Sequence, residues 1–249
     1  MLTLETLGGN MIDLKTYLEL PSETIEEIIK HAESEFPRES CGYIVDNKYV
    51  ACINSSEEQE DSFVIEEISF YKYYLDKKIQ WIVHSHNNNQ CASKIDMKKQ
   101  RGMEVPFIIV NIKYGKLSDL FFFGSNIKLP YIGRPFYFGC TDCLTLVKDY
   151  YKDKFNMALP NPPRSINFNE VGDKLFESYL EEQLKKFDLI KKEDIEEDDI
   201  LFYQWNNQIG HVGIYINKNK VLHHFVNQLS GYYPLEYKYK NLFFAFRRK

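Results

Sequence analysis

Apolar residues in the first part of the chain recur at the spacing of an amphipathic helix. Five of them share one helical face: Ile25, Ile28, Ile29, Ala32 and Phe36. They predict a helix that starts at Pro21-Ser22 and stops before Pro37. Later apolar patterns predict strands at 41–46, 48–54, 79–85, 105–113 and 117–123, and helices at 65–76 and 93–102. The order αββαβαββ predicts an α/β domain.

A second block of patterned sequence follows a loop of turn-forming residues. The loop GSNIKLPYIGRP, residues 124–135, contains two glycines and two prolines, which favour turns. Beyond it, one helical pattern begins at Cys143 and a second spans 173–187. Strands are predicted at 199–204, 211–216, 220–226 and 242–247. Helices followed by antiparallel strands form an α+β layout, so we predict two domains, 1–126 and 127–249.

Charge and hydropathy exclude several classes of function. The formal net charge is −5, whereas nucleic-acid binders carry a clustered excess of Lys and Arg, so no nucleic-acid partner is expected. No apolar run approaches the ~20 residues that span a bilayer, so no membrane segment is expected. The first residues include acidic side chains where a secretion signal would be basic. We therefore expect a chain made in the cytoplasm without a standard secretion signal.

The cysteines and one acidic run need separate interpretation. The 5 cysteines form no evenly spaced framework, so reduced thiols are expected. Cys140 and Cys143 form a C-x-x-C, which also fits a redox dithiol or half of a zinc site. Residues 193–199 are almost all acidic, and consecutive carboxylates rarely converge on one ion, so a solvated loop is predicted there.

A first group of polar residues has the composition of a metal site. His84 and His86 lie two residues apart at the end of an apolar strand, so both imidazoles point to the same face. Asp96, on the following helix, can supply a third ligand for zinc. Two other interpretations stay open, because a His-x-His pair can be half exposed and Ser93-x-x-Asp96 is also a helix capping box.

The segment PRESCGYIV, which contains Glu39, adds a further motif to these residues. Together, Glu-x-Cys-Gly, His-x-His and Ser-x-x-Asp resemble the motifs of the JAMM (MPN-like) metallopeptidase family. The resemblance implies that His84, His86 and Asp96 bind Zn²⁺. It further implies that Glu39 is the general base and that Ser93 stabilises the oxyanion. Six residues separate His86 from Ser93, one fewer than is usual in that family.

A second group of residues has the composition of a cysteine nucleophile and its base. Asp142-Cys143 opens a helix, where backbone N–H groups and the helix dipole favour a thiolate. His211 starts one predicted strand and His223 lies on the next, so a hairpin can bring the imidazoles together. His224 is adjacent to His223, and only the twelve-residue spacing from His211 favours His223. A buried structural role stays open for each residue taken singly.

Together these motifs resemble the NlpC-type cysteine peptidases, papain-like enzymes that cut peptidoglycan stem peptides. The resemblance implies that Cys143 is the nucleophile, His211 the base and His223 the orienting residue, with no cofactor. Phe136 stands where many relatives have a tyrosine, so the oxyanion would depend largely on the backbone N–H of Cys143. In this reading Cys140 has no catalytic role.

The order of the two motif sets resembles the phage tail assembly protein K family, which joins a JAMM domain to an NlpC-type domain. This resemblance implies a protein of the virion tail tip, assembled in the host cytoplasm with other tail-tip proteins and directed at peptidoglycan stem peptides. Two alternatives stay open: a structural tail-tip assembly factor with one or both sites inactive, and a cellular JAMM-type isopeptidase.

Overall fold

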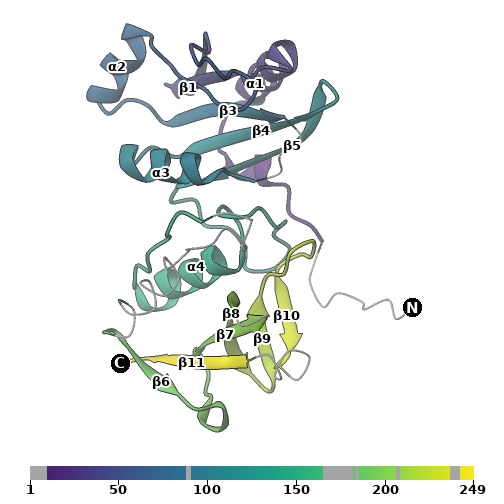
Figure 1. Cartoon of the computed structure of the whole chain (residues 1–249), viewed down its shortest axis with the longest axis vertical. Coiled ribbons are helices and arrows are strands. Elements are labelled where there is room, and N and C mark those ends of the chain that lie inside the picture. Colours follow the sequence, from purple (N-terminus) through teal and green to yellow (C-terminus); the bar gives the residue numbers. More distant parts are fainter. Residues whose placement is uncertain (1–9, 88–90, 165–181, 183–184, 206–207, 236–241) are drawn as a thin grey trace. The chain divides into compact units, whose positions relative to one another are not determined.

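The computed structural model in Figure 1 describes residues 10–87, 91–164, 182, 185–205, 208–235 and 242–249. Among these residues, 13–127 form one compact unit, and 128–249 together with 10–12 form another. We call them the N-terminal unit and the C-terminal unit. Each has a sheet of its own, so the chain is a two-sheet α+β protein. Within the described residues, no helix combines the length and apolar character needed to span a membrane.

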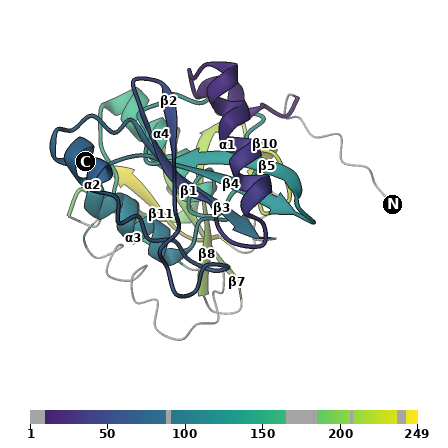
Figure 2. The ribbon, with the colours of Figure 1, turned by 90° about the horizontal axis from the view of Figure 1, so that it is seen from above.

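The N-terminal unit is a mixed five-stranded sheet with the order β2-β1-β3-β4-β5. Its strands are β1 (Cys41–Val45), β2 (Lys48–Cys52), β3 (Trp81–Asn87), β4 (Phe107–Lys113) and β5 (Lys116–Phe123). Its helices are η1 (Leu14–Tyr17), α1 (Ser22–Glu35), α2 (Ile68–Leu75) and α3 (Lys94–Met103). Helix α1 packs on this sheet and contacts β2, β3, β4 and β5 (Figure 2). Only β3 and β4 are parallel, because α3 crosses between them.

Local sequence explains the shape of the first hairpin. Asp46 and Asn47 both have positive φ, at 51° and 60°, which short polar residues tolerate and which a two-residue hairpin turn requires. A Cβ on Gly42 would lie 2.4 Å from the Val50 carbonyl oxygen and 2.6 Å from the Tyr49 ring. Glycine at position 42 therefore leaves room for the β2 backbone beside β1 and for the Tyr49 ring over this position.

The C-terminal unit combines one long helix with a six-stranded sheet of order β10-β9-β8-β7-β11-β6. The helix is α4 (Cys143–Phe155), which packs against β8 and β9. The other elements are β6 (Phe187–Ile190), η2 (Lys192–Asp194), β7 (Ile200–Trp205), β8 (Gln208–Asn217), β9 (Lys220–His223), β10 (Gly231–Pro234) and β11 (Leu242–Arg248). The buried face of α4, including Leu146, Val147 and Tyr151, forms one core with β7, β8 and β11.

Most predicted elements are confirmed, with differences at their ends. The predicted helix 65–76 begins only at Ile68, and the predicted strand 220–226 ends at His223. The predicted helix 173–187 lies largely outside the described residues, and its last residue, Phe187, belongs to a strand. Four short elements were not predicted: η1, β6, η2 and β10.

The acidic run 193–199 is only partly the solvated loop that the sequence predicted. Asp199 is buried and accepts hydrogen bonds from Arg247 on β11, with Nε–Oδ1 and Nη2–Oδ2 distances of 2.9 Å each. Asp198 accepts a hydrogen bond from the Tyr150 hydroxyl and pairs with Lys154 at 2.7 Å. Two carboxylates of this run therefore tie the start of β7 to β11 and to α4.

Candidate functional sites

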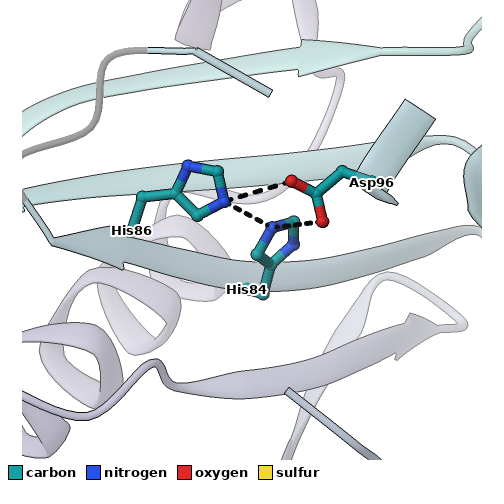
Figure 3. A group of neighbouring side chains, drawn as sticks. All are labelled: His84, His86 and Asp96. Carbon is teal, nitrogen blue, oxygen red and sulfur yellow. Dashed lines mark hydrogen bonds and ion pairs between the residues drawn. The ribbon is translucent and has the colours of Figure 1, made fainter. Parts of the chain in front are cut away.

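The three predicted metal ligands converge in the N-terminal unit. His84 and His86 point from β3 toward Asp96 in the first turn of α3, as Figure 3 shows. The two imidazole Nε2 atoms are 3.0 Å apart. The Asp96 carboxylate places Oδ1 3.4 Å from His84 Nε2 and Oδ2 3.3 Å from His86 Nε2. The group lies where β3 ends and its crossover helix begins, the edge at which α/β sheets commonly bind ligands.

Burial and mutual charge fix the electrostatics of this group. All three residues are buried. Burial lowers the pKa of His84, which favours the neutral imidazole that metals bind. Burial opposes charge on His86, but Asp96 outweighs it and raises the pKa of that imidazole. Burial would also raise the pKa of Asp96, yet the two histidines hold it well below its usual range.

The ligand atoms fit a small tetrahedral ion. Metal–ligand bonds of ~2.0–2.1 Å in tetrahedral geometry separate neighbouring ligand atoms by roughly 3.3 Å. Here the imidazole nitrogens are 3.0 Å apart, and they lie 3.4 and 3.3 Å from Oδ1 and Oδ2 of Asp96, two different oxygens of its carboxylate, so the spacing is near this value. Two imidazoles and one carboxylate are also the donor types that zinc accepts. The His84 ring is held by stacking on Phe63, with centroids 4.5 Å apart.

Glu39 and Ser93 complete the first predicted group. Glu39 precedes β1, and its Oε1 lies 3.9 Å from His86 Nε2. Burial raises the pKa of Glu39 to about 7, a value suited to exchanging protons near neutral pH. The Ser93 hydroxyl donates to Asp96 Oδ2 at 2.6 Å and accepts from the Asp96 N–H at 3.0 Å. Ser93 is therefore a helix cap that also adjoins the metal group.

A cleft of about 90 Å³ opens beside these residues. Its lining includes Glu39, His86, Ser93 and Asp96. All five sequence-predicted residues of the N-terminal unit thus lie together, four of them on one cleft and His84 directly behind it. The arrangement can hold a divalent cation next to a carboxylate of raised pKa.

In the C-terminal unit, Cys143 is the first residue of α4, and Asp142 is its cap. Asp142 accepts a hydrogen bond from the Thr145 N–H at 3.0 Å. Its carboxylate is almost fully buried and pairs with Arg164, at Nη2–Oδ1 and Nη2–Oδ2 distances of 2.8 and 2.6 Å. Burial would raise the pKa of Asp142, but Arg164 outweighs burial and lowers it. Arg164 was not predicted, because no sequence pattern connects it with Asp142, 22 residues earlier.

Burial works against ionisation of the Cys143 thiol. Burial raises the pKa of Cys143 to about 12, and the neighbouring Asp142 carboxylate adds to the shift. The backbone N–H groups of Val212 and Leu144 act in the opposite direction, as the helix terminus was expected to do, but they do not outweigh burial. The contact with Val212 places the thiol against the backbone of β8, the strand that carries His211, the residue predicted as its base.

His211 and His223 form the predicted imidazole pair. Strands β8 and β9 place Gly213 opposite His223, and His211 Nε2 lies 2.9 Å from His223 Nδ1. His224 has different neighbours, packing against Phe136 with ring centroids 5.0 Å apart. Burial lowers the pKa of His224 to about 4, so this imidazole is neutral near pH 7. Among the described residues, His223 rather than His224 is therefore the neighbour of His211.

Comparisons with known proteins match the C-terminal part of the chain to a family and most of the chain to one phage protein. The sequence model of the NlpC/P60 family matches residues 133–248. Tail tip assembly protein K of Escherichia phage N15 is 28% identical over 221 residues, which cover 85% of this chain and 88% of that protein. The family match contains Cys143, His211 and His223. The family model thus covers the C-terminal part of the chain, and the similarity to the phage protein covers most of the chain.

Solved structures of the NlpC/P60 family are also similar to parts of the chain. A lipoprotein-like member from Staphylococcus aureus has 20% identity and a TM-score of 0.31, covering 51% of this chain and 36% of that one. The NlpC/P60 domain of the peptidoglycan hydrolase SagA has 15% identity and a TM-score of 0.33, covering 47% and 89%. A Bacillus cereus member has 13% identity and a TM-score of 0.33, covering 92% and 67%.

Proposed function

Since this chain is a homologue of tail tip assembly protein K with an NlpC/P60 domain in its C-terminal part, we propose that it is a phage tail-tip component with cysteine endopeptidase activity. The substrate is an amide bond of a peptidoglycan stem peptide. The observation that carries the proposal is Cys143 at the start of α4, beside β8, where His211 pairs with His223. The protein is assembled with other tail-tip proteins in the host cytoplasm and acts from the virion.

The C-terminal unit divides the chemistry among three side chains. His211 uses Nε2 to contact His223, which leaves its Nδ1 to receive the thiol proton. The Cys143 sulfur then attacks the substrate carbonyl, and the Cys143 backbone N–H donates to the developing oxyanion. His211 returns the proton to the leaving amine, and water releases the acyl group from sulfur. Because burial raises the pKa of Cys143, catalysis depends on this transfer to His211.

For the N-terminal unit we propose a JAMM-type zinc peptidase, with domain limits at 1–126 and 127–249. His84, His86 and Asp96 would hold Zn²⁺, which when bound supplies Lewis acidity for hydrolysis of a peptide or isopeptide bond. Glu39 takes up and returns a proton, consistent with its raised pKa. The Ser93 hydroxyl donates to the substrate carbonyl oxygen in place of Asp96.

The zinc proposal predicts a clear difference in metal content. The purified full-length protein should carry about one zinc per chain, and His84→Ala should carry almost none, because two remaining ligands hold the ion far more weakly. Elemental analysis of freshly purified protein measures this. Cys91→Ser is the matched control, because it tests whether the nearby Cys91 thiol is a zinc ligand. This variant should keep its zinc. A wild-type protein free of zinc and unable to bind added zinc would contradict the proposal.

Digestion of purified sacculi tests the functional proposal and separates the two units. Wild-type protein should release soluble stem-peptide fragments, Cys143→Ala should release none, and His84→Ala should act like wild type. If both variants release no fragments, both units are needed for cleavage of the cell wall. If wild-type protein of verified fold releases nothing, the alternative of a structural tail-tip assembly factor replaces the proposal.

A further inference from the structure

The imidazole pair of the C-terminal unit is enclosed by aromatic rings. Phe225 stacks on His211 with ring centroids 4.3 Å apart and an interplanar angle of 19°. The same ring meets His223 nearly edge-on, at 4.0 Å and 77°. One phenylalanine therefore contacts both imidazoles that the chemistry of Cys143 requires.

The position of Phe225 is itself fixed by its neighbours. The chain turns directly after β9, where the Gln228 N–H donates to the Phe225 carbonyl oxygen at 3.1 Å. Tyr233 on β10 packs edge-on against His223 at 4.7 Å and lies 6.1 Å from the Phe225 ring. The Tyr233 hydroxyl donates to the Leu229 carbonyl oxygen at 3.0 Å. The rings thus hold each other in place.

Stacking supplies what the hydrogen bond between the imidazoles lacks. A single Nε2–Nδ1 bond fixes the distance between the rings but leaves each ring able to tilt about that bond. A ring stacked at 19° removes this freedom for His211. When His211 accepts the thiol proton, its positive charge also lies over the electron-rich face of Phe225, which favours the protonated form.

We propose that Phe225 is a positioning residue for the cysteine chemistry, holding His211 in the orientation that receives the Cys143 proton and stabilising the resulting imidazolium. This inference rests on the proposed function in that His211 must be the base. It assigns a role to a residue outside the Cys, His and His motif positions.

The rate of Cys143 alkylation by iodoacetamide, followed against pH in the full-length protein, tests the proposal without a peptide substrate. The sulfur displaces iodide, a C–S bond replaces the C–I bond, and the thiol proton passes to His211. Mass spectrometry of the Cys143 peptide separates this thiol from the other four. Among the described residues, the titratable side chains whose rings contact the pair are Tyr203 on β7 and Tyr233 on β10, and Cys143 lies at the start of α4 beside β8. Burial raises the pKa of both tyrosines, so neither ionises near neutral pH.

Phe225→Leu keeps an apolar side chain but removes the ring. It should slow alkylation at pH 7 roughly two- to tenfold, the range expected for losing one aromatic contact, and should shift the rate profile toward higher pH. Phe225→Tyr restores the stack and should return both values to those of wild type. Val226→Ala, at the exposed neighbouring position, is the matched control and should change neither.

Three outcomes would overturn the inference or its premise. If Phe225→Leu alkylates as wild type while His211→Ala is slow, Phe225 does not position the base, although the proposed function stands. If Leu and Tyr variants are equally slow and both unfold at lower temperature, Phe225 only packs. If His211→Ala alkylates as fast as wild type, His211 is not the base, and the proposed function itself fails.

Discussion

We expect His211→Ala to lower kcat/KM for a stem-peptide substrate by about 10²–10⁴-fold, the usual contribution of a general acid–base residue. The reason is that burial raises the pKa of the Cys143 thiol to about 12. At neutral pH almost no thiolate exists without a proton acceptor, and His211 is the imidazole on β8 next to Val212. The measurement is steady-state hydrolysis of a synthetic stem peptide.

His224→Ala is the control for this prediction because His224 is equally buried and only 13 positions further along the chain. It packs on Phe136 and not on His211. The variant should lose stability but keep kcat/KM per folded molecule. Equal losses of kcat/KM in both variants would show that the hairpin merely needs two imidazoles for its packing, and would remove His211 as the base.

Arg164→Ala should lower the free energy of unfolding of the C-terminal unit by about 3–5 kcal/mol, as expected when one partner of a buried ion pair is removed. The Asp142 carboxylate would stay buried without its guanidinium partner, at the residue that caps α4. Urea denaturation followed by tryptophan fluorescence or circular dichroism measures the loss. Cys143 should also alkylate abnormally, since α4 begins at this cap.

The double variant Asp142→Asn/Arg164→Gln separates charge from packing, because it removes both charges and keeps similar side-chain volumes. It should regain much of the stability lost in Arg164→Ala. The pKa of Asp142 is lowered on folding, so its contribution is complete above its unfolded value of ~4 and is lost as pH falls toward the folded value. A loss of stability in Arg164→Ala that persists unchanged at acidic pH would contradict this assignment.

Local geometry could place residues that are close together in sequence, whereas the family resemblances were needed to join Glu39 to the histidines of β3 and Cys143 to His211. The two-residue spacing of His84 and His86 follows from strand geometry, and Ser93 and Asp96 are joined by one helical turn. The hairpin that pairs His211 with His223 is also local, since only a tight turn separates β8 from β9. These placements needed periodicity and turn chemistry alone.

Contacts across long stretches of chain could not be predicted in the same way. Arg164 reaches Asp142 from a coil segment without periodicity, and Phe225 stacks on His211 because the chain bends where a longer strand was predicted. The acidic run shows the same limit. Charge density alone indicated solvent exposure, but Arg247, 48 residues later, buries Asp199. Pairing partners of this kind depend on tertiary packing, which overrides local pattern.

The capping box of α3 links the position of a predicted metal ligand to the structure of the helix, because Asp96 belongs to both. Asp96 closes the first turn of the helix through its contacts with Ser93, and the same carboxylate faces both histidines. Fraying of that turn would move the Asp96 carboxylate away from the two histidines. An ion bound by all three residues would oppose the fraying. If the group binds an ion, its affinity would depend partly on the order of α3, and binding would in turn stabilise the first turn of the helix.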